Sequence, residues 1–248
     1  MKTKNFQPRT YRRWAYGGRF HTLEAVVKET DLHILSATPL DQGYCIERVT
    51  FYRSQIEEYI NYRDRRFLTE LKPLAVEKTA PAIVKAMARA AEKAGVGPMA
   101  AVAGTVAQYV GKDILRRGCR DVIVENGGDI FLQVRRPVEV GLYAGDSPLS
   151  GKLRLSIKPQ QTPLGICTSS GTVGHSLSFG KADAVVILAR NACLADAVAT
   201  AAANRVQAAE DLPEAVDFAR RIRGVSGVVA VIGSSCASWG GIELIPGK

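Results

Sequence analysis

Two helical patterns stand back to back in the middle of the chain, and strand patterns lie on both sides of them. Thr79 and Pro81 are helix start signals, and the apolar spacing that follows ends at glycines before Pro98 opens the second helix. This second pattern ends at Gly118, directly after two arginines that suit a helix C-terminus. Strand runs around a block of helices predict an α+β fold with mixed or antiparallel sheets flanked by helices.

The remaining elements are read from local periodicity. Residues 19–38 predict an antiparallel hairpin that turns at Glu29, Thr30 and Asp31. Residues 40–71 have helical spacing, with a separate short helical piece from residue 65. A meander of strands is expected at 121–124, 130–134, 138–143 and 153–157. The last expected elements are a strand at 184–189, helices at 192–206 and 213–223, and strands at 227–232 and 238–245.

Length and composition fit a protein with a full hydrophobic core. The 248 residues are 46% hydrophobic and 23% charged, which suits one large domain over residues 19–248 or two intertwined subdomains. Residues 1–18 form a basic segment that contributes to the net charge of +9. Such a segment can attract phosphates, although a solvated terminus is the simpler reading. No zinc-finger, RNA-binding or helix-turn-helix pattern is found, so nucleic acid is not expected as the partner.

The five cysteines are spread widely and include no CxxC pair. This usage favours reduced thiols and a cytoplasmic protein. The basic start is not followed by an apolar stretch, so a secretory signal is not expected. The uncharged stretches at 94–111 and 224–242 are interrupted by glycines, which indicates the interior of a soluble fold rather than a membrane span. A homo-oligomer remains open.

Three segments could support chemistry, and the first two are short. Gly127, Gly128 and Asp129 lie between two strand patterns, where the glycines would let the backbone approach a ligand; a hairpin turn is the alternative. Asp196 and Thr200 are four residues apart on the alanine-rich helix and would share a face, as in a partial Mg²⁺ shell. The alternative is that Asp196 only complements the dipole of its own helix.

The third segment, residues 159–180, has no charged side chain and reads as a loop. Thr168, Ser169, Ser170 and Gly171 offer hydroxyls and backbone amides, which suit a phosphate-bearing ligand. A Cys167 or Ser169 nucleophile with His175 as its base is conceivable, but no strand-serine-helix elbow surrounds the serine. For Cys167, a small buried thiol is the simpler interpretation.

In this order, the three segments resemble the ApbE-type flavin transferases. The shared motifs are Gly-Gly-Asp at 127–129, the Ser-Gly loop at 168–171, and Ala-Asp with Ala-Thr at 195–200. The resemblance covers roughly residues 90–245 and implies an ApbE-like fold with two pseudo-related lobes and a flavin or nucleotide cleft between them. It also implies Mg²⁺ on Asp196 and Thr200, with the Ala100 carbonyl as a further match.

The chain departs from the transferase pattern in two places. The family has a His-x-x-Asp-Pro-x-Thr-Gly segment before the late helix, whereas this chain offers only His175 and Asp183, which become the catalytic candidates. Ala101 replaces the lysine that follows alanine in the family's first helix.

A smaller ApbE-like branch found largely in anaerobic archaea and bacteria is more similar, through segments at 27–32, 67–69 and 71–74. This resemblance implies a role in assimilating sulfide into homocysteine. Three functions therefore stay open. They are binding of a phosphate-containing small molecule with a role in sulfide assimilation, Mg²⁺-dependent transfer of FMN from FAD to a protein, and non-catalytic ligand binding or scaffolding.

Overall fold

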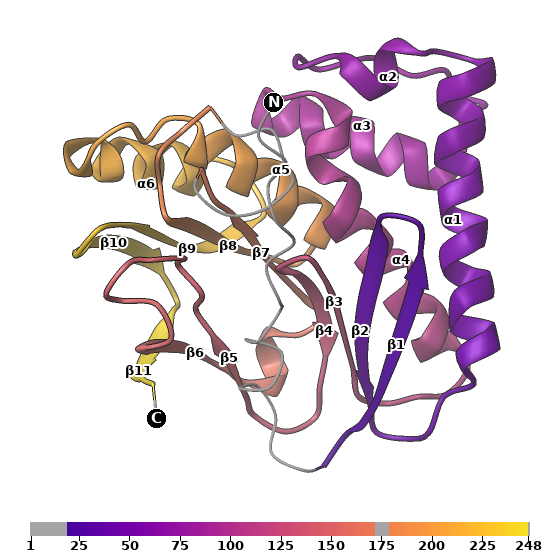
Figure 1. Ribbon diagram of the computed structural model, residues 1–248, viewed down its shortest axis with the longest axis horizontal. Coiled ribbons are helices and arrows are strands. Elements are labelled where there is room, and N and C mark those ends of the chain that lie inside the picture. Colours follow the sequence, from indigo (N-terminus) through magenta and orange to yellow (C-terminus); the bar gives the residue numbers. More distant parts are fainter. Residues whose placement is uncertain (1–18, 172–178, 248) are drawn as a thin grey trace.

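The computed structural model describes residues 19–171 and 179–247 (Figure 1). Its main sheet has the strand order β1-β2-β3-β4-β7-β8-β9-β10, and every neighbouring pair is antiparallel. The eight strands are β1 (His21–Val27), β2 (Thr30–Ser36), β3 (Val122–Asn126), β4 (Asp129–Gln133), β7 (Leu164–Ser169), β8 (Ala184–Ala189), β9 (Val225–Ile232) and β10 (Ser235–Gly240). A second sheet, in the order β11-β6-β5, contains β5 (Val138–Gly141), β6 (Leu153–Ile157) and β11 (Glu243–Pro246).

The helices form a layer on one face of the main sheet, and the smaller sheet covers part of the other face (Figure 1). They are α1 (Gln42–Tyr62), α2 (Arg66–Thr69), α3 (Ala82–Ala94), α4 (Val102–Arg116), α5 (Ala192–Ala203) and α6 (Leu212–Arg220). Short 3₁₀ turns occur at Pro98–Ala101, Pro159–Gln161 and Ala209–Asp211. Side-chain caps fix two helix starts, because Asp41 accepts from the Tyr44 amide at α1 and Asn191 accepts from the Leu194 amide at α5.

Alternate residues of the central strands enter different cores. On β8, Val185 and Ile187 face the helices, whereas Val186 and Leu188 face the smaller sheet. This follows from the two-residue period of a strand. Both faces are covered, so the strand is an unbroken apolar run rather than an alternating one.

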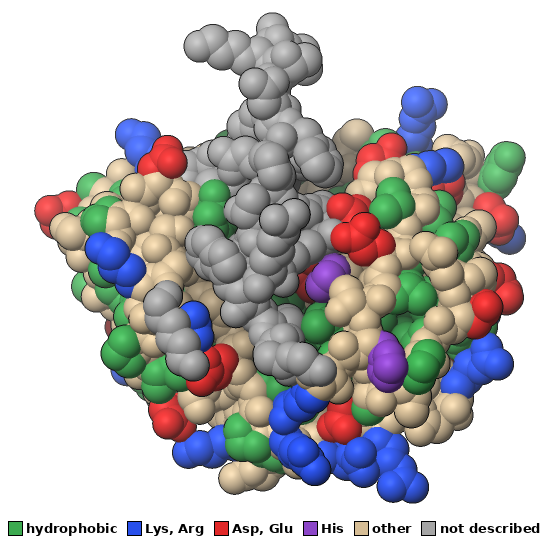
Figure 2. Space-filling view, turned by 60° about the horizontal axis from the view of Figure 1, so that its bottom comes forward, with side chains coloured by type: hydrophobic (Ala, Val, Ile, Leu, Met, Phe, Trp, Pro, Cys, Tyr) green, Lys and Arg blue, Asp and Glu red, His purple; other side chains and the backbone are tan. Residues whose placement is uncertain are grey.

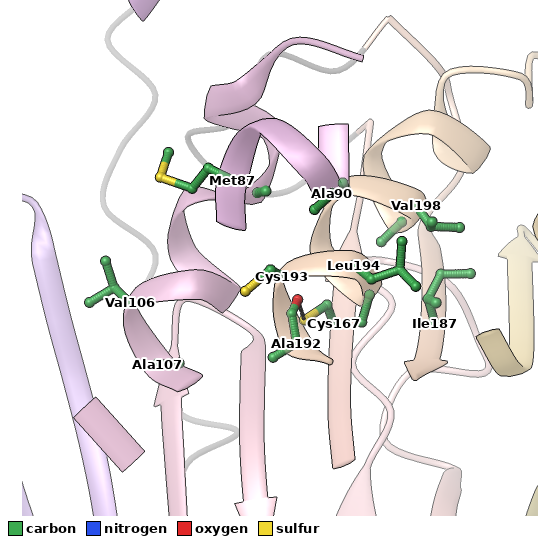
Figure 3. Packing of buried hydrophobic residues seen from close by; sticks show 14 of the residues in the cluster. Met87, Ala90, Val106, Ala107, Cys167, Ile187, Ala192, Cys193, Leu194 and Val198 are labelled. Atoms are coloured by element: carbon green, nitrogen blue, oxygen red, sulfur yellow. Dashed lines mark hydrogen bonds between the residues drawn. The ribbon is translucent and has the colours of Figure 1, made fainter. Parts of the chain in front are cut away.

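The helices lie unusually close to the sheet because glycine and alanine occupy the contacts. A Cβ at Gly165 of β7 would lie 2.4 Å from the Ala192 Cα of α5, and a Cβ at Gly111 of α4 would lie 2.4 Å from the Phe131 ring. Figure 3 shows α5 within this layer, with Leu194 beside Ile187 of β8. The alanine-rich composition of α5 is therefore a packing requirement, since larger side chains would push the helix off the sheet.

The α+β class is confirmed, but several sequence-based expectations about the strands are wrong. The expected loop over 159–180 contains β7, a buried strand between β4 and β8. Its Thr and Ser residues obscured the strand signal, and turn residues at both ends reinforced the loop interpretation. The expected four-strand meander is instead two hairpins in different sheets, because β3 and β4 belong to the main sheet while β5 and β6 pair in the smaller one.

Two further strand elements differ from the expectation in their position along the chain. The first hairpin turns at Lys28 and Glu29, and Thr30 already pairs with Val27. Lys28 has φ +53°, and this left-handed residue closes the turn in two positions rather than three. The expected final strand at 238–245 is split into β10 and β11, which belong to different sheets. Gly240, with φ +102°, ends the first of them.

Acidic, basic and apolar side chains are all exposed on the described surface, and the apolar ones include Tyr62, Leu71 and Phe179. On the face in Figure 2, Lys and Arg side chains gather most densely along the lower edge. None of the helices in the described ranges combines the length and the hydropathy that a membrane span requires.

Candidate functional site

The Gly127–Gly128 pair forms the turn of the β3–β4 hairpin. Asn126 pairs with Asp129 across the turn, and both glycines have positive φ values of +66° and +101°. The Gly128 N–H donates to Glu125 Oε1 at 2.7 Å. This geometry is the one that two-residue hairpin turns require. The hairpin interpretation of these glycines is therefore correct, and the turn places Asp129 at the start of a central strand.

Asp129 is buried on the helix side of the sheet. Its Oδ1 accepts the Thr168 N–H from the neighbouring strand at 3.3 Å. Burial raises the pKa of this carboxyl well above its usual range, and the charge on Asp196 raises it further. Hydrogen bonds from Cys167 and from the Thr168 backbone act in the opposite direction. Burial dominates because it removes water from an otherwise charged group.

Asp196 binds the start of a different helix. It lies in the second turn of α5, and its Oδ2 accepts the Gly104 N–H at 2.8 Å. The Ala103 backbone N–H also bonds to this carboxylate. Both amides belong to the first turn of α4, whose N–H groups have no partners within their own helix. Asp196 therefore caps α4, and the expectation that it complements the dipole of its own helix is wrong.

The Asp196 carboxyl has a pKa far from its ordinary value. Burial raises its pKa to about 7, while the hydrogen bonds from the Gly104 and Ala103 amides lower it. In the described part of the chain, no lysine or arginine forms an ion pair with Asp129 or Asp196. Two buried carboxyls without such a counter-ion must hold protons or share a bound cation.

The hydroxyl-bearing residues lie farther along the same face. Helix α5 runs along β7 in the same direction. At one end Gly165 contacts Ala192. At the other end Gly171 contacts Gly180, which in turn contacts Ala203. Ser169 is 7% exposed, and its Oγ has no hydrogen-bond partner among the described residues. Thr200 of α5 is also buried. A buried hydroxyl without a partner is uncommon in folded proteins and marks a place where a ligand can supply one.

These side chains would suit a hard cation such as Mg²⁺. Carboxylate, hydroxyl and backbone oxygens are its preferred donors, and Mg²⁺ usually needs only one or two protein carboxylates. The described residues contain no group of three or more His, Cys, Asp and Glu that could hold a metal. The fit therefore depends on Asp129 and Asp196 together with neutral oxygens, as in sites where a substrate phosphate completes the shell.

Cys167 lies beneath α5 beside both acids, which sequence patterns did not indicate. Its Sγ is 3.4 Å from the Ala192 carbonyl oxygen, a contact drawn in Figure 3. Burial and the two carboxylates raise the pKa of its thiol well above the usual range. Such a thiol stays protonated and is a poor nucleophile. The small buried thiol is therefore the correct interpretation of Cys167.

The remaining candidate site residues, Gly171, Asp183, Ser170 and His175, have different positions in the structure. The Gly171 N–H bonds to the Ala182 carbonyl, which joins the end of β7 to the segment before β8. Asp183 Oδ2 accepts the Gly233 N–H at 2.7 Å, so its carboxylate holds the turn between β9 and β10. Ser170 has interactions of its own. His175 lies outside the described residues.

Comparisons with known proteins agree with this architecture. The family model described as AbpE bacteria matches residues 12–230. A UPF0280 protein of Methanocella arvoryzae is 41% identical over 224 residues, which cover 90% of each chain. A UPF0280 protein of Methanococcus aeolicus is 46% identical over 195 residues, covering 77% of this chain and 78% of the relative.

Solved structures show the same fold at low sequence identity. The apo flavinyl transferase ApbE of Pseudomonas stutzeri superposes with a TM-score of 0.60 at 11% identity, covering 89% of this chain and 94% of that one. The flavin transferase ApbE of Vibrio cholerae gives a TM-score of 0.60 at 12% identity, covering 91% and 97%. The sequence motifs, the fold and the extended matches lead to one assignment: the chain belongs to the family described as AbpE bacteria, together with the archaeal UPF0280 proteins.

Proposed function

We propose that this protein binds a phosphate-containing small molecule, a flavin or a nucleotide, together with Mg²⁺ at the site formed by Asp129 and Asp196. The observation that supports this most directly is the pair of buried carboxyls from β4 and α5 without an ion-pair partner in the described ranges. A divalent cation would neutralise both and would in turn attract phosphate oxygens.

The neighbouring groups have roles that fit such a ligand. Asp196 would hold Mg²⁺ together with Thr200, and Ala100 near the start of α4 offers a backbone carbonyl. The unpartnered Ser169 hydroxyl would donate to a phosphate oxygen. The Gly127–Gly128 turn would leave space for the ligand beside Thr168, because a Cβ at Gly128 would meet the Thr168 side chain only at 4.0 Å. Mg²⁺ would supply charge neutralisation for the phosphates.

Isothermal titration calorimetry tests this proposal. FAD, FMN and ADP are titrated into the full chain with MgCl₂ and with EDTA. We expect Mg²⁺-dependent binding of at least one ligand and a loss of roughly tenfold or more in Asp196→Asn, because one charge–cation contact disappears. Asp217→Asn is the matched control, since that half-exposed carboxylate pairs with Arg220. Equal affinities in Asp196→Asn and the wild type would contradict the proposal.

A catalytic version of this site would transfer FMN from FAD to a protein threonine: the threonine hydroxyl oxygen would bond to the FMN phosphorus, the pyrophosphate bond of FAD would break, and AMP would leave. The fold that the chain shares with flavin transferases favours this version. Incubation with FAD, MgCl₂ and a threonine-containing acceptor peptide should then give a covalently flavinylated peptide, detectable by mass spectrometry. Binding of FAD without peptide modification would leave the non-catalytic ligand-binding function.

A role in assimilating sulfide into homocysteine is a separate proposal that rests on the resemblance to the archaeal branch. Cys167 would not serve as a thiol nucleophile in it, because its thiol is buried and its pKa is raised. Growth of a deletion strain on limiting sulfide, with and without added homocysteine, is the test. Unchanged growth without homocysteine would remove this role and leave the ligand-binding proposal untouched.

A further inference from the structure

A hollow of about 610 Å³ opens on the surface between the C-terminal ends of α3 and α6. It is lined by Lys93, Arg221, Ile222, Arg223 and Gly224. None of these residues belongs to the Asp129–Asp196 site. Three of the five lining residues carry a positive charge, so the hollow presents a concave and strongly basic surface.

The cations of this hollow are exposed side chains at the surface. Within the described residues, no ion pair involves Lys93, Arg221 or Arg223. Arg220, one position before Arg221, pairs instead with Asp217 at 2.9 Å. Unpaired like charges that line one concavity repel each other, and a bound anion relieves that repulsion.

The backbone that holds the two arginines is fixed in place. Gly224 has φ +109°, and a Cβ there would lie 2.9 Å from the Leu194 side chain of α5. The Val225 N–H bonds to the Ile222 carbonyl at 3.1 Å, which closes the turn. A tight turn packed against a helix limits the positions that Arg221 and Arg223 can reach. An already ordered backbone loses less entropy when the two arginines bind an anion.

Compensation of helix dipoles accounts for only part of this cluster. Lys93 lies in the last turn of α3 and Arg221 caps α6, where cations are favourable without any ligand. Arg223 follows the end of α6 by three residues, beyond the range of that effect. Its position in the same hollow calls for another explanation.

We propose that this hollow is a second ligand site, which binds the phosphoryl groups of a phosphate-bearing small molecule independently of Mg²⁺. The guanidinium forks of Arg221 and Arg223 would bind phosphoryl oxygens in bidentate geometry, and Lys93 would add a point charge. The two sites have opposite chemistry. The Asp129–Asp196 site needs a metal to attract phosphate, whereas the hollow attracts it directly.

Calorimetric titration of sodium pyrophosphate in EDTA, at low ionic strength, tests this proposal on the full chain. The test variant is Arg221→Ala/Arg223→Ala. The control is Arg66→Ala/Arg220→Ala, which lowers the net charge by the same two units but removes arginines already paired with Asp64 and Asp217. We expect the test variant to lose roughly tenfold or more in affinity, and the control to retain the wild-type value.

Three outcomes would overturn the proposal. Equal losses in both double variants would mean general attraction to net positive charge, and no pyrophosphate binding by the wild type would mean that the hollow is not a site. Urea unfolding of the same variants supplies the third outcome. If the test variant lost stability but kept its affinity for pyrophosphate, the only remaining role of these arginines would be compensation of the helix dipole. Asp196→Asn should bind pyrophosphate normally in EDTA, which separates this test from that of the metal-dependent site.

Discussion

Gly104 and Asp196 join the two central helices at one point. The Gly104 N–H of α4 donates to the Asp196 carboxylate of α5 at 2.8 Å. A Cβ at position 104 would lie 2.5 Å from the Ala192 carbonyl oxygen and 2.9 Å from the Asp196 Cβ. The glycine therefore allows the close helix approach on which the position of the carboxylate depends.

Gly104→Ala should destabilise the protein by about 1–3 kcal/mol, the usual range for an added methyl group in a packed interior. The clash is with backbone atoms, so α4 and α5 must move apart and lengthen the hydrogen bond to Asp196. Urea unfolding measures the change. Gly141→Ala is the control, because nothing lies within 4 Å of its added Cβ. Equal midpoints for the two variants would show that the helices are not in tight contact.

Stability should fall as pH rises from about 4 to about 7, owing to the neighbouring buried carboxyls of Asp196 and Asp129, whose pKa values are both raised. Burial raises the pKa of Asp196 from 3.8 to about 7. In that window the folded protein keeps a proton that the unfolded chain has released, so the stabilisation is complete below pH 4 and is lost as pH passes 7. The size is bounded by about 1.4 kcal/mol per pKa unit. Unfolding free energies from urea titrations at pH 5 and pH 8 provide the measurement.

Asp196→Asn should reduce this pH dependence, because an amide does not titrate and its oxygen can still accept the Gly104 N–H. Added MgCl₂ should raise the unfolding free energy of the wild type at pH 8, and so flatten its pH profile, if the cation binds the ionised pair. An identical slope in Asp196→Asn and the wild type would assign the effect to other groups.

The helices could be predicted because their signals are local. Thr79, Pro81, Pro98 and Gly118 lie near real helix ends, and the strands around the Gly127–Gly128 turn were found by their apolar runs. Pairing between strands is a long-range property, and local patterns do not determine it. That is why β7 was missed. A buried antiparallel strand with Cys167, Thr168 and Ser169 in it lacks the β-branched aliphatic run that identifies β8.

The candidate site could be predicted as a set of segments but not as a geometry. The Gly-Gly-Asp turn, the end of β7 and Asp196 do converge, since Asp129 bonds to Thr168 and the charge on Asp196 affects its pKa. The partner of Asp196 was not predicted, because the free N–H groups of α4 lie 92 positions away in the chain. A glycine inside a helical pattern, at position 104, was the one available signal of a close approach.

Asp183→Ala should reduce stability without affecting ligand binding. Its carboxylate accepts the Gly233 N–H at 2.7 Å and so supports the β9–β10 turn. Loss of this bond should cost about 0.5–1.5 kcal/mol. Asp183→Asn can preserve the acceptor and should be closer to the wild type. Thermal unfolding and flavin calorimetry on both variants separate the two roles, and a loss of affinity in Asp183→Asn at unchanged stability would support Asp183 as a site residue.

Asp113→Ala should be among the most destabilising changes outside the candidate site, because the Asp113 side chain joins α1 to α4. Its carboxylate accepts from Arg48 at 2.8 Å, from the Tyr52 hydroxyl at 2.7 Å and from Arg116 at 2.6 Å. The Arg48 side chain is only 19% exposed and would keep only the longer contact with Glu47, at 3.8 Å, so the change should cost about 3 kcal/mol. Arg116 is 71% exposed, and Arg116→Ala should cost under about 1 kcal/mol. Urea unfolding of both variants distinguishes a partly buried anchor from a surface pair; similar small losses would mean that water replaces Asp113 at Arg48.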